Sequence, residues 1–130
     1  GRPLNQPIVE FYYKNDDLGD PLLNENHIDL LSLASAKEIN ELREQALKIN
    51  ELLIRRFSTI DLKLVDFKLE FGRQPDGILI LADEISPDTC RLWDRKTNEK
   101  MDKDRFRRNL GGLLEAYQEV WNRLNKGEDA

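Results

Sequence analysis

The chain has 130 residues, of which 39% are hydrophobic and 35% charged, and its formal net charge is −5. This length is enough for one domain with a hydrophobic core, and the acidic balance argues against a general nucleic-acid binder. No apolar run approaches the ~20 residues that span a bilayer, the first residues lack the apolar segment of a signal peptide, and the single cysteine, Cys90, excludes an internal disulfide. We therefore expect a cytoplasmic protein that binds neither membranes nor nucleic acid.

The N-terminal part of the sequence predicts a connector, a strand and a turn. Residues 1–7 contain prolines and no initiator Met, which indicates an excised or partial chain. β-Branched and aromatic residues then predict a strand over 7–14, and turn-forming residues end it over 15–21. Over 22–34 we expect a loop or a short turn of helix, with His27 as an ordinary loop residue.

A long amphipathic helix is predicted to follow. Ser35 and Glu38 have the Ser-x-x-Glu spacing of a capping box. The apolar residues behind them recur at three- and four-residue steps, as on one face of a helix of about six turns. These residues are Ile39, Leu42, Ala46, Ile49, Leu53 and Phe57.

Two strands joined by a turn are predicted next. Over 64–72 apolar residues alternate with Asp66, Lys68 and Glu70, which predicts one apolar and one charged face. The run 78–81 has no polar alternation and predicts a second strand that is covered on both sides. The Asp-Gly pair at 76–77 predicts the turn of a hairpin.

A long loop over 84–100 and helical sequence after it complete the chain, because 84–100 shows no helical period. Asp102 is a candidate cap for a helix from Lys103, which the two glycines at 111–112 weaken or bend, and 126–130 is expected to be a frayed tail. The predicted fold class is α+β, a small, mainly antiparallel sheet covered by helices. The apolar stripe of the last helix is Leu113, Leu114, Tyr117, Val120, Trp121 and Leu124.

The charged strand face is the first candidate for chemistry. Asp66, Lys68 and Glu70 are either a solvated face or, if half-buried, a site whose charges need partners. Asp83 directly follows the second strand, and Glu70 with Asp83 is a plausible carboxylate pair for Mg²⁺. The spacing is compatible with both interpretations, the solvated face and the site.

The Ser-Pro-Asp segment at 86–88 is the second candidate. Asp88 could accept hydrogen bonds from a substrate and Arg91 could hold a phosphate, although an ordinary turn explains both. Lys14 could also reach a phosphate, but a surface lysine is the simpler interpretation. Cys90, Trp93 and Trp121 are expected in the core.

Taken in order, these segments resemble the SAICAR synthetase (phosphoribosylaminoimidazole-succinocarboxamide synthase) family. The resemblance runs over almost the whole chain, and it implies the C-terminal part of that fold, without the N-terminal ATP-binding lobe. We expect 1–130 to form a single domain or partial chain that binds substrate and metal. The matching segments are 14–17 with 20–21, 24–25, 64–72, 82–88, 91–94 and 100–107.

The resemblance implies a ligase of purine biosynthesis that uses ATP and Mg²⁺. Such an enzyme joins L-aspartate to the carboxylate of an aminoimidazole ribonucleotide (CAIR) through an acyl phosphate, and the family suggests a homodimer. By motif, the substrate ligands are Lys14, Asp88 and Arg91, the residues at the reacting centre are Asp66 and Lys68, and the metal ligands are Glu70 and Asp83.

Two alternatives remain beside the ligase. The chain by itself is expected to be inactive, so it could be a non-catalytic fragment that binds ribonucleotide or a partner chain without turnover. It could also be a structural domain that pairs through the apolar stripe of the 35–57 helix, which would leave the acidic segments unexplained.

Overall fold

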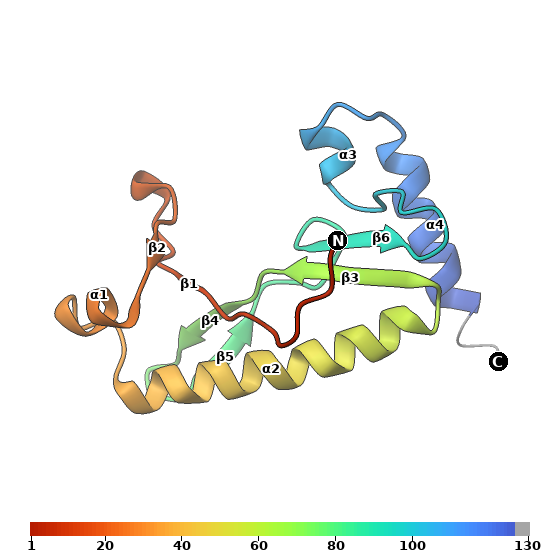
Figure 1. Ribbon diagram of the computed structural model, residues 1–130. Helices are drawn as coiled ribbons and strands as arrows, with labels where there is room; N and C mark the ends of the chain where they lie inside the picture. Colours follow the sequence, from red (N-terminus) through yellow and green to blue (C-terminus); the bar gives the residue numbers. More distant parts are fainter. Residues whose placement is uncertain (127–130) are drawn as a thin grey trace. The chain divides into compact units, whose positions relative to one another are not determined.

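The computed structural model describes residues 1–126. The chain divides into two compact units, Gly1–Ile49 and Asn50–Ala130, and the boundary falls inside the helix α2, Ala36–Ser58 (Figure 1). Within the described part, no helix has the length and apolar character needed to cross a membrane.

The first unit begins with a small two-stranded sheet. β1, Phe11–Tyr12, pairs antiparallel with β2, Leu22–Leu23, so the strand is much shorter than the one predicted over 7–14. The turn-forming residues between them make the 3-10 helix η1, Asp16–Leu18. Asn15 caps it by accepting the amide hydrogen of Leu18 at 3.0 Å, which is the side-chain bonding that makes Asn a turn residue.

A short helix stands where a loop or a single turn was expected. α1 spans Glu25–Leu30. Asn24 Oδ1 accepts the amide hydrogen of His27 at 3.0 Å, and His27 Nδ1 accepts that of Asn24 at 3.2 Å. His27 therefore takes part in the capping of α1, and its assignment to a loop was wrong.

The long helix and its start are confirmed. α2 spans Ala36–Ser58, 23 residues. Ser35 Oγ accepts the amide hydrogen of Glu38 at 3.1 Å, and Glu38 Oε1 accepts that of Ser35 at 3.0 Å. These reciprocal bonds are the predicted capping box.

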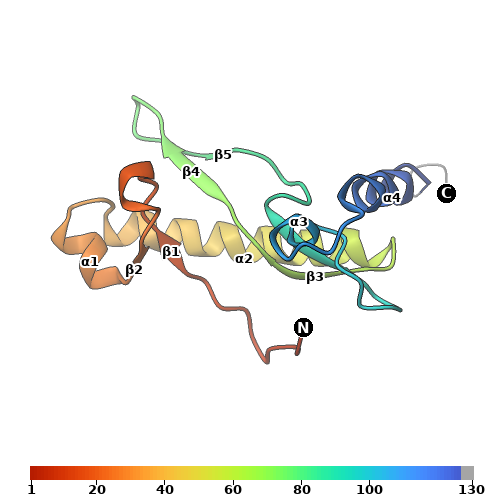
Figure 2. The same ribbon diagram turned by 90° about the horizontal axis from the view of Figure 1, so that it is seen from above.

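The second unit is built on the antiparallel pair of β3, Leu62–Phe67, and β6, Cys90–Asp94. The two strands lie side by side in both views (Figures 1 and 2). The segment 84–100 was expected to be a loop, and β6 corrects that expectation. Its buried positions Cys90 and Leu92 alternate with exposed Arg91, as in any strand with one covered face.

The core of this unit joins the end of α2, both strands of the pair and the last helix. Leu62 and Leu92 are completely buried at its centre. Cys90 is buried as expected, and burial raises the pKa of its thiol. The buried cluster consists of Phe57, Ile60, Leu62, Cys90, Leu92, Met101, Ala116 and Val120.

The strand predicted over 64–72 is interrupted. β3 ends at Phe67, and the chain resumes as β4, Glu70–Arg73, which pairs with β5, Leu79–Ala82. The hairpin and its Asp-Gly turn are confirmed, with Gly77 at φ 87°, but only the second half of the predicted strand belongs to it. The side chains of Ile80 and Leu81 are 40% and 46% exposed, so in the described residues β5 is not covered on both sides.

The glycine pair separates two helices. α3 covers Asp104–Arg107 and α4 covers Leu113–Lys126, with Gly111 and Gly112 at φ 71° and 67° between them. A left-handed backbone at both positions is incompatible with a continuous helix, so the chain forms two helices rather than one bent helix.

Only part of the apolar stripe predicted for α4 faces the core. Ala116 and Val120 are buried and Leu124 packs against them, whereas Leu114 and Trp121 are 79% and 61% exposed. The expectation that Trp121 lies in the core was wrong. α4 still includes Lys126, the first residue of the predicted tail, and the rest of that tail lies outside the described residues.

The α+β fold class is confirmed. The sheet, however, is not one surface, because the described strands form three separate two-stranded antiparallel sheets.

Candidate functional site

The β3–β6 pair brings two of the predicted site residues together. Asp66 and Arg91 are partners in the strand register, and Arg91 Nη1 donates to Asp66 Oδ2 at 2.7 Å. Both side chains are about half exposed. The hydrogen bond to Asp66 is the main reason that the pKa of Arg91 lies above its usual value.

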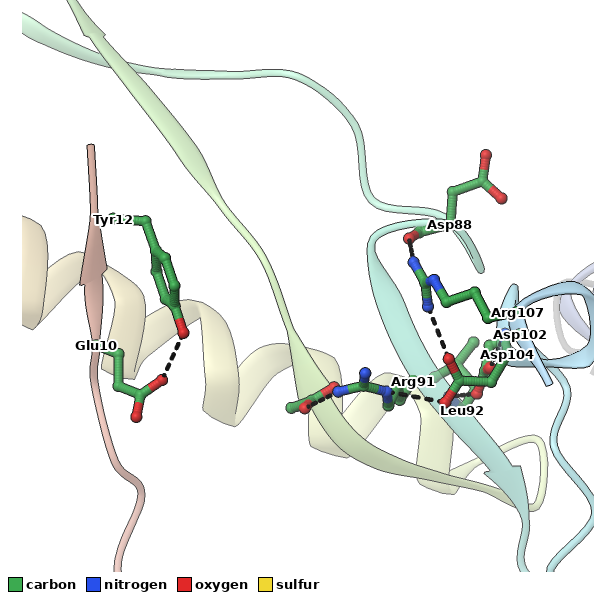
Figure 3. Close-up of polar contacts among 9 residues, drawn as sticks. Glu10, Tyr12, Asp88, Arg91, Leu92, Asp102, Asp104 and Arg107 are labelled. Atoms are coloured by element: carbon green, nitrogen blue, oxygen red, sulfur yellow. Dashed lines mark hydrogen bonds and ion pairs between the residues drawn. The ribbon is translucent and has the colours of Figure 1, made fainter. Parts of the chain in front are cut away.

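Asp104 links this pair to a second arginine. Its Oδ2 accepts from Arg91 Nε at 3.0 Å, and its Oδ1 accepts from Arg107 Nη1 at 2.9 Å. Figure 3 shows Asp104 between the two guanidinium groups. Hydrogen bonding to Arg107, with a smaller contribution from Arg91, lowers the pKa of Asp104 although burial opposes this.

A buried acid, Asp102, fixes the backbone next to Arg91 and at Asp104. Asp102 has no exposed surface. Its Oδ2 accepts the amide hydrogen of Leu92, and its Oδ1 accepts that of Asp104, each at 2.8 Å. Burial raises the pKa of Asp102. Since Leu92 follows Arg91 in β6, one carboxylate fixes the backbone on both sides of the Arg91–Asp104 ion pair.

The Ser-Pro-Asp turn places Asp88 beside α3 and α4. Ser86 Oγ accepts the amide hydrogen of Asp88 at 3.1 Å, and Arg107 Nη2 donates to the Asp88 carbonyl oxygen at 3.4 Å. The Asp88 carboxylate points away from Arg107 (Figure 3) and accepts a hydrogen bond from the Tyr117 hydroxyl. Burial, and then this bond, raise the pKa of Tyr117.

Lys68 lies between β3 and β4, and Glu70 is the first residue of β4. Lys68 Nζ is 2.9 Å from Glu70 Oε1, and the amide of Lys68 donates to the Thr89 carbonyl at 2.8 Å. The Glu70 side chain is 19% exposed. The register sets Glu70 opposite Ala82, one residue before Asp83, so the hairpin brings the backbones of the two predicted metal ligands to the same end of the β4–β5 pair.

The predicted residues thus fall into three groups. Asp66, Asp88 and Arg91 belong to one polar network with Asp104 and Arg107, and Lys68 pairs with Glu70 near Asp83. Lys14 belongs to the first unit, directly after β1.

Sequence reasoning missed Asp104, Arg107 and Tyr117. Asp102 was considered only as a helix cap, a role that its bond to the amide of Asp104 fits. The available signal was the charge-rich segment 100–107, in which acids at 102 and 104 are followed by arginines at 105 and 107. Nothing in that pattern says which arginine each acid contacts.

The network can hold an anion. Arg91 and Arg107 are each 44% exposed, whereas Asp104 between them is 10% exposed. Guanidinium groups held in a fixed orientation with donors facing solvent are suited to phosphate or carboxylate oxygens.

Comparisons with known proteins agree with the resemblance seen in the sequence. The SAICAR synthetase family model matches residues 1–124. The chain is 60% identical over 124 residues to the phosphoribosylaminoimidazole-succinocarboxamide synthase of Bacillus cytotoxicus, which covers 95% of this chain and 52% of that protein. The corresponding enzyme of Bacillus mycoides matches to the same extent.

Solved structures give the same result. The crystal structure of the synthase from Ehrlichia chaffeensis superposes with a TM-score of 0.91 at 51% identity, covering 96% of this chain and 54% of that one. A SAICAR synthetase in complex with ADP superposes with a TM-score of 0.88 at 52% identity, covering 93% and 52%. The chain thus spans about half the length of the relatives it matches. On the extent of the family match and the agreement in fold, the chain belongs to the SAICAR synthetase family.

Proposed function

We propose that this chain supplies the substrate- and metal-binding part of an ATP- and Mg²⁺-dependent ligase that joins L-aspartate to the carboxylate of CAIR. The observation that carries the proposal is the network of Asp66, Arg91 and Asp104, in a chain 60% identical to a synthase of that name. The solved relative that holds ADP supports ATP as the nucleotide.

Arg91 is the proposed ligand of the ribonucleotide phosphate. A guanidinium has five N–H donors, and the ion pairs with Asp66 and Asp104 use one on Nη1 and one on Nε. Both donors on Nη2 lie outside these two ion pairs, on a side chain that is 44% exposed. Lys14 is the proposed second phosphate contact.

Asp66 and Asp88 are the proposed orienting acids for the substrate. Asp66 already holds Arg91, so it can set the angle between the phosphate ligand and the rest of the ribonucleotide. The Asp88 carboxylate uses one oxygen to accept from Tyr117, and its second oxygen can accept from a substrate amine or hydroxyl.

Lys68 is the proposed cation at the reacting centre. Its ammonium group, 2.9 Å from Glu70, can neutralise the substrate carboxylate or the phosphoryl group that is transferred to it. Bringing these anions together is the main physical difficulty of the reaction, and positioned cations relieve it.

Glu70 and Asp83 are the proposed ligands of Mg²⁺. Within residues 1–126, no three acidic, histidine or cysteine side chains gather as a metal cluster. A pair of carboxylates nevertheless fits this ion, because Mg²⁺ is commonly held by one or two carboxylates together with waters and substrate phosphates. When bound, Mg²⁺ would neutralise phosphate charge on the nucleotide.

The proposed course has two steps. The terminal phosphoryl group of ATP passes to the CAIR carboxylate, with loss of ADP and formation of an acyl phosphate. The aspartate amine then attacks the acyl carbon, the C–N bond forms, the amine loses a proton and inorganic phosphate leaves. The protein residues bind and orient the reactants in this course, and none has to act as a covalent nucleophile.

A chimera tests the proposal. In it, this chain replaces the residues that it matches in the Bacillus cytotoxicus relative. We expect phosphate release only when ATP, Mg²⁺, CAIR and L-aspartate are all present, and none from the Glu70→Gln chimera. Glu51→Gln, at an exposed position of α2, is the matched control and should release phosphate at the parent rate. Normal release by Glu70→Gln would refute the metal assignment.

The 130-residue chain by itself tests the second candidate, binding without turnover. We expect it to bind CAIR in a calorimetric titration and to release no phosphate from ATP. Homodimerisation, which the family suggests, is checked by the sedimentation velocity of the same sample. Phosphate release by the isolated chain would contradict the expectation that it needs the remainder of a synthase.

A further inference from the structure

Asp104 is a buried acid between two half-exposed cations. Its side chain is 10% exposed, against 44% for both Arg91 and Arg107. Each carboxylate oxygen accepts from a different arginine, at 3.0 Å and 2.9 Å. Neither guanidinium can rotate away without breaking a charge-assisted hydrogen bond, which is about twice as strong as a neutral one.

The backbone at Asp104 is fixed as well. Asp102 accepts the amide hydrogens of both Leu92 and Asp104 at 2.8 Å, and the amide of Met101 donates to the Leu92 carbonyl at 2.7 Å. These bonds tie the start of α3 to β6 at the residue next to Arg91. The separation between Asp104 and the Arg91 backbone is therefore set by buried contacts rather than by a surface ion pair.

From this arrangement we propose that Asp104 is a positioning residue for phosphate recognition, because it holds Arg91 through Nε and leaves the Nη2 donors for the phosphate of the ribonucleotide. The inference rests on the proposed function, in which Arg91 is the phosphate ligand. A purely structural Asp104 would neutralise the two arginines and stabilise α3 without affecting ligand recognition.

The chain offers a matched control for that structural role. Asp94 is as buried as Asp104, at 6% against 7% relative exposure, and it also pairs with an arginine, Arg123 Nη2, at 2.8 Å. Asp94 lies at the opposite end of β6 from Cys90, and it has no part in the proposed site. Asp104→Asn and Asp94→Asn should both lower stability, so a difference between them in binding is not a consequence of stability alone.

Binding is measured by NMR titration of the 130-residue chain with CAIR and with its dephosphorylated nucleoside. We expect Asp104→Asn to weaken CAIR binding at least about tenfold, since hydrogen bonds between charged groups are among the stronger ones. Asp94→Asn should change it less than about twofold. Neither variant should alter binding of the nucleoside, because the proposed contact is to phosphate.

Two results would overturn the proposal. One is an equal loss of CAIR binding in both variants, which is the behaviour of a structural residue. The other is a wild-type chain that binds CAIR no better than the nucleoside, because Asp104 would then position no phosphate ligand. Turnover by the chimera is a separate readout, so failure of the proposed ligase activity is distinguished from failure of this inference.

Two further variants cover a failure of Asp104→Asn to fold. Asp104→Glu keeps the charge but displaces the carboxylate by one methylene, and we expect weaker CAIR binding with an unfolding midpoint near that of wild type. In an Arg91→Gln background the Asp104→Glu change should weaken CAIR binding by less than about twofold, because its effect passes through Arg91. Additive losses in the double variant would contradict the positioning role.

Discussion

Replacing Asp102 with Asn should destabilise the second unit from its centre. Asp102 is fully buried, and its two oxygens accept the amide hydrogens of Leu92 and Asp104 at 2.8 Å each. Asn has the same shape but only one acceptor oxygen. In either orientation, its NH₂ group would face one of the two amide hydrogens, donor against donor.

The expected loss is roughly 2 kcal/mol of the free energy of unfolding. A buried N–H left without an acceptor costs about 1–3 kcal/mol. The opposing effect is that burial raises the pKa of Asp102, so the ionised carboxylate is itself disfavoured and a neutral Asn recovers part of the loss. A domain with a total stability of about 5–15 kcal/mol would remain folded but clearly weakened.

Urea unfolding measures the loss, and hydrogen exchange locates it. We expect faster exchange at the amides of Leu92 and Asp104 in the Asp102→Asn variant. The matched control is Asp61→Asn, because Asp61 is 55% exposed, lies 3.8 Å from Lys96 and has φ 57°, a conformation that Asn tolerates. That control should change stability by less than about 0.5 kcal/mol. Equal effects of the two substitutions, or unchanged exchange at Leu92 and Asp104, would refute the reasoning.

Three further predictions concern the same unit, each measured by urea unfolding. Leu92→Ala should cost about 2–5 kcal/mol because Leu92 is fully buried, whereas Leu114→Ala at a 79% exposed position should be nearly neutral. Gly111→Ala should cost about 1 kcal/mol, because φ is 71° there. Gly72→Ala, at ordinary φ with open space around it, is the control, and an equal cost would show that backbone strain at Gly111 is not the cause. The pKa of Asp94 is lowered to about 2, mainly by the hydrogen bond from the Thr97 amide, with a contribution from Arg123. Asp94 therefore stabilises the fold above pH ~4 by roughly 2 kcal/mol, and this contribution disappears as the pH falls toward 2. Asp94→Asn should show the deficit at pH 7 and none below pH ~2, and a deficit independent of pH would contradict the pKa shift.

Sequence motifs predicted correctly those parts of the fold that depend on interactions between residues close in the chain. The capping box of Ser35 and Glu38 contains all its partners within four residues, so α2 could be placed from the sequence to within a residue or so at each end. The Asp-Gly turn before β5 is likewise self-contained, since the Ile78 amide donates to Asp76 Oδ1 at 3.0 Å. In both cases the residues that decide the structure are neighbours in the chain.

The bulge inside β3 could not be predicted because it depends on a distant partner. The register between β3 and β6 shifts between Leu64 and Asp66, so Val65 is an extra residue in β3. Such a bulge lets Leu64 and Phe67, which a regular alternation would place on opposite faces, both pack on the core. The alternation from Val65 to Phe71 looked continuous in the sequence because the shift arises only when β6 pairs with β3.

In the candidate site, too, side-chain contacts between residues distant in the chain could not be predicted from the sequence. The types and spacing of Asp66, Lys68 and Glu70 marked the predicted strand over 64–72 as unusual, and a resemblance supplied their proposed roles. Asp104 is of an equally ordinary type, but its environment is made by Arg91, 13 residues earlier, and by Arg107. Residues that would touch a ligand can be recognised by their chemistry, whereas a residue that holds them in place is recognised only from its contacts. Mutagenesis is therefore most informative at residues that contact the predicted ligands without touching the substrate. A substitution there changes how the guanidinium groups are oriented and leaves the groups themselves in place.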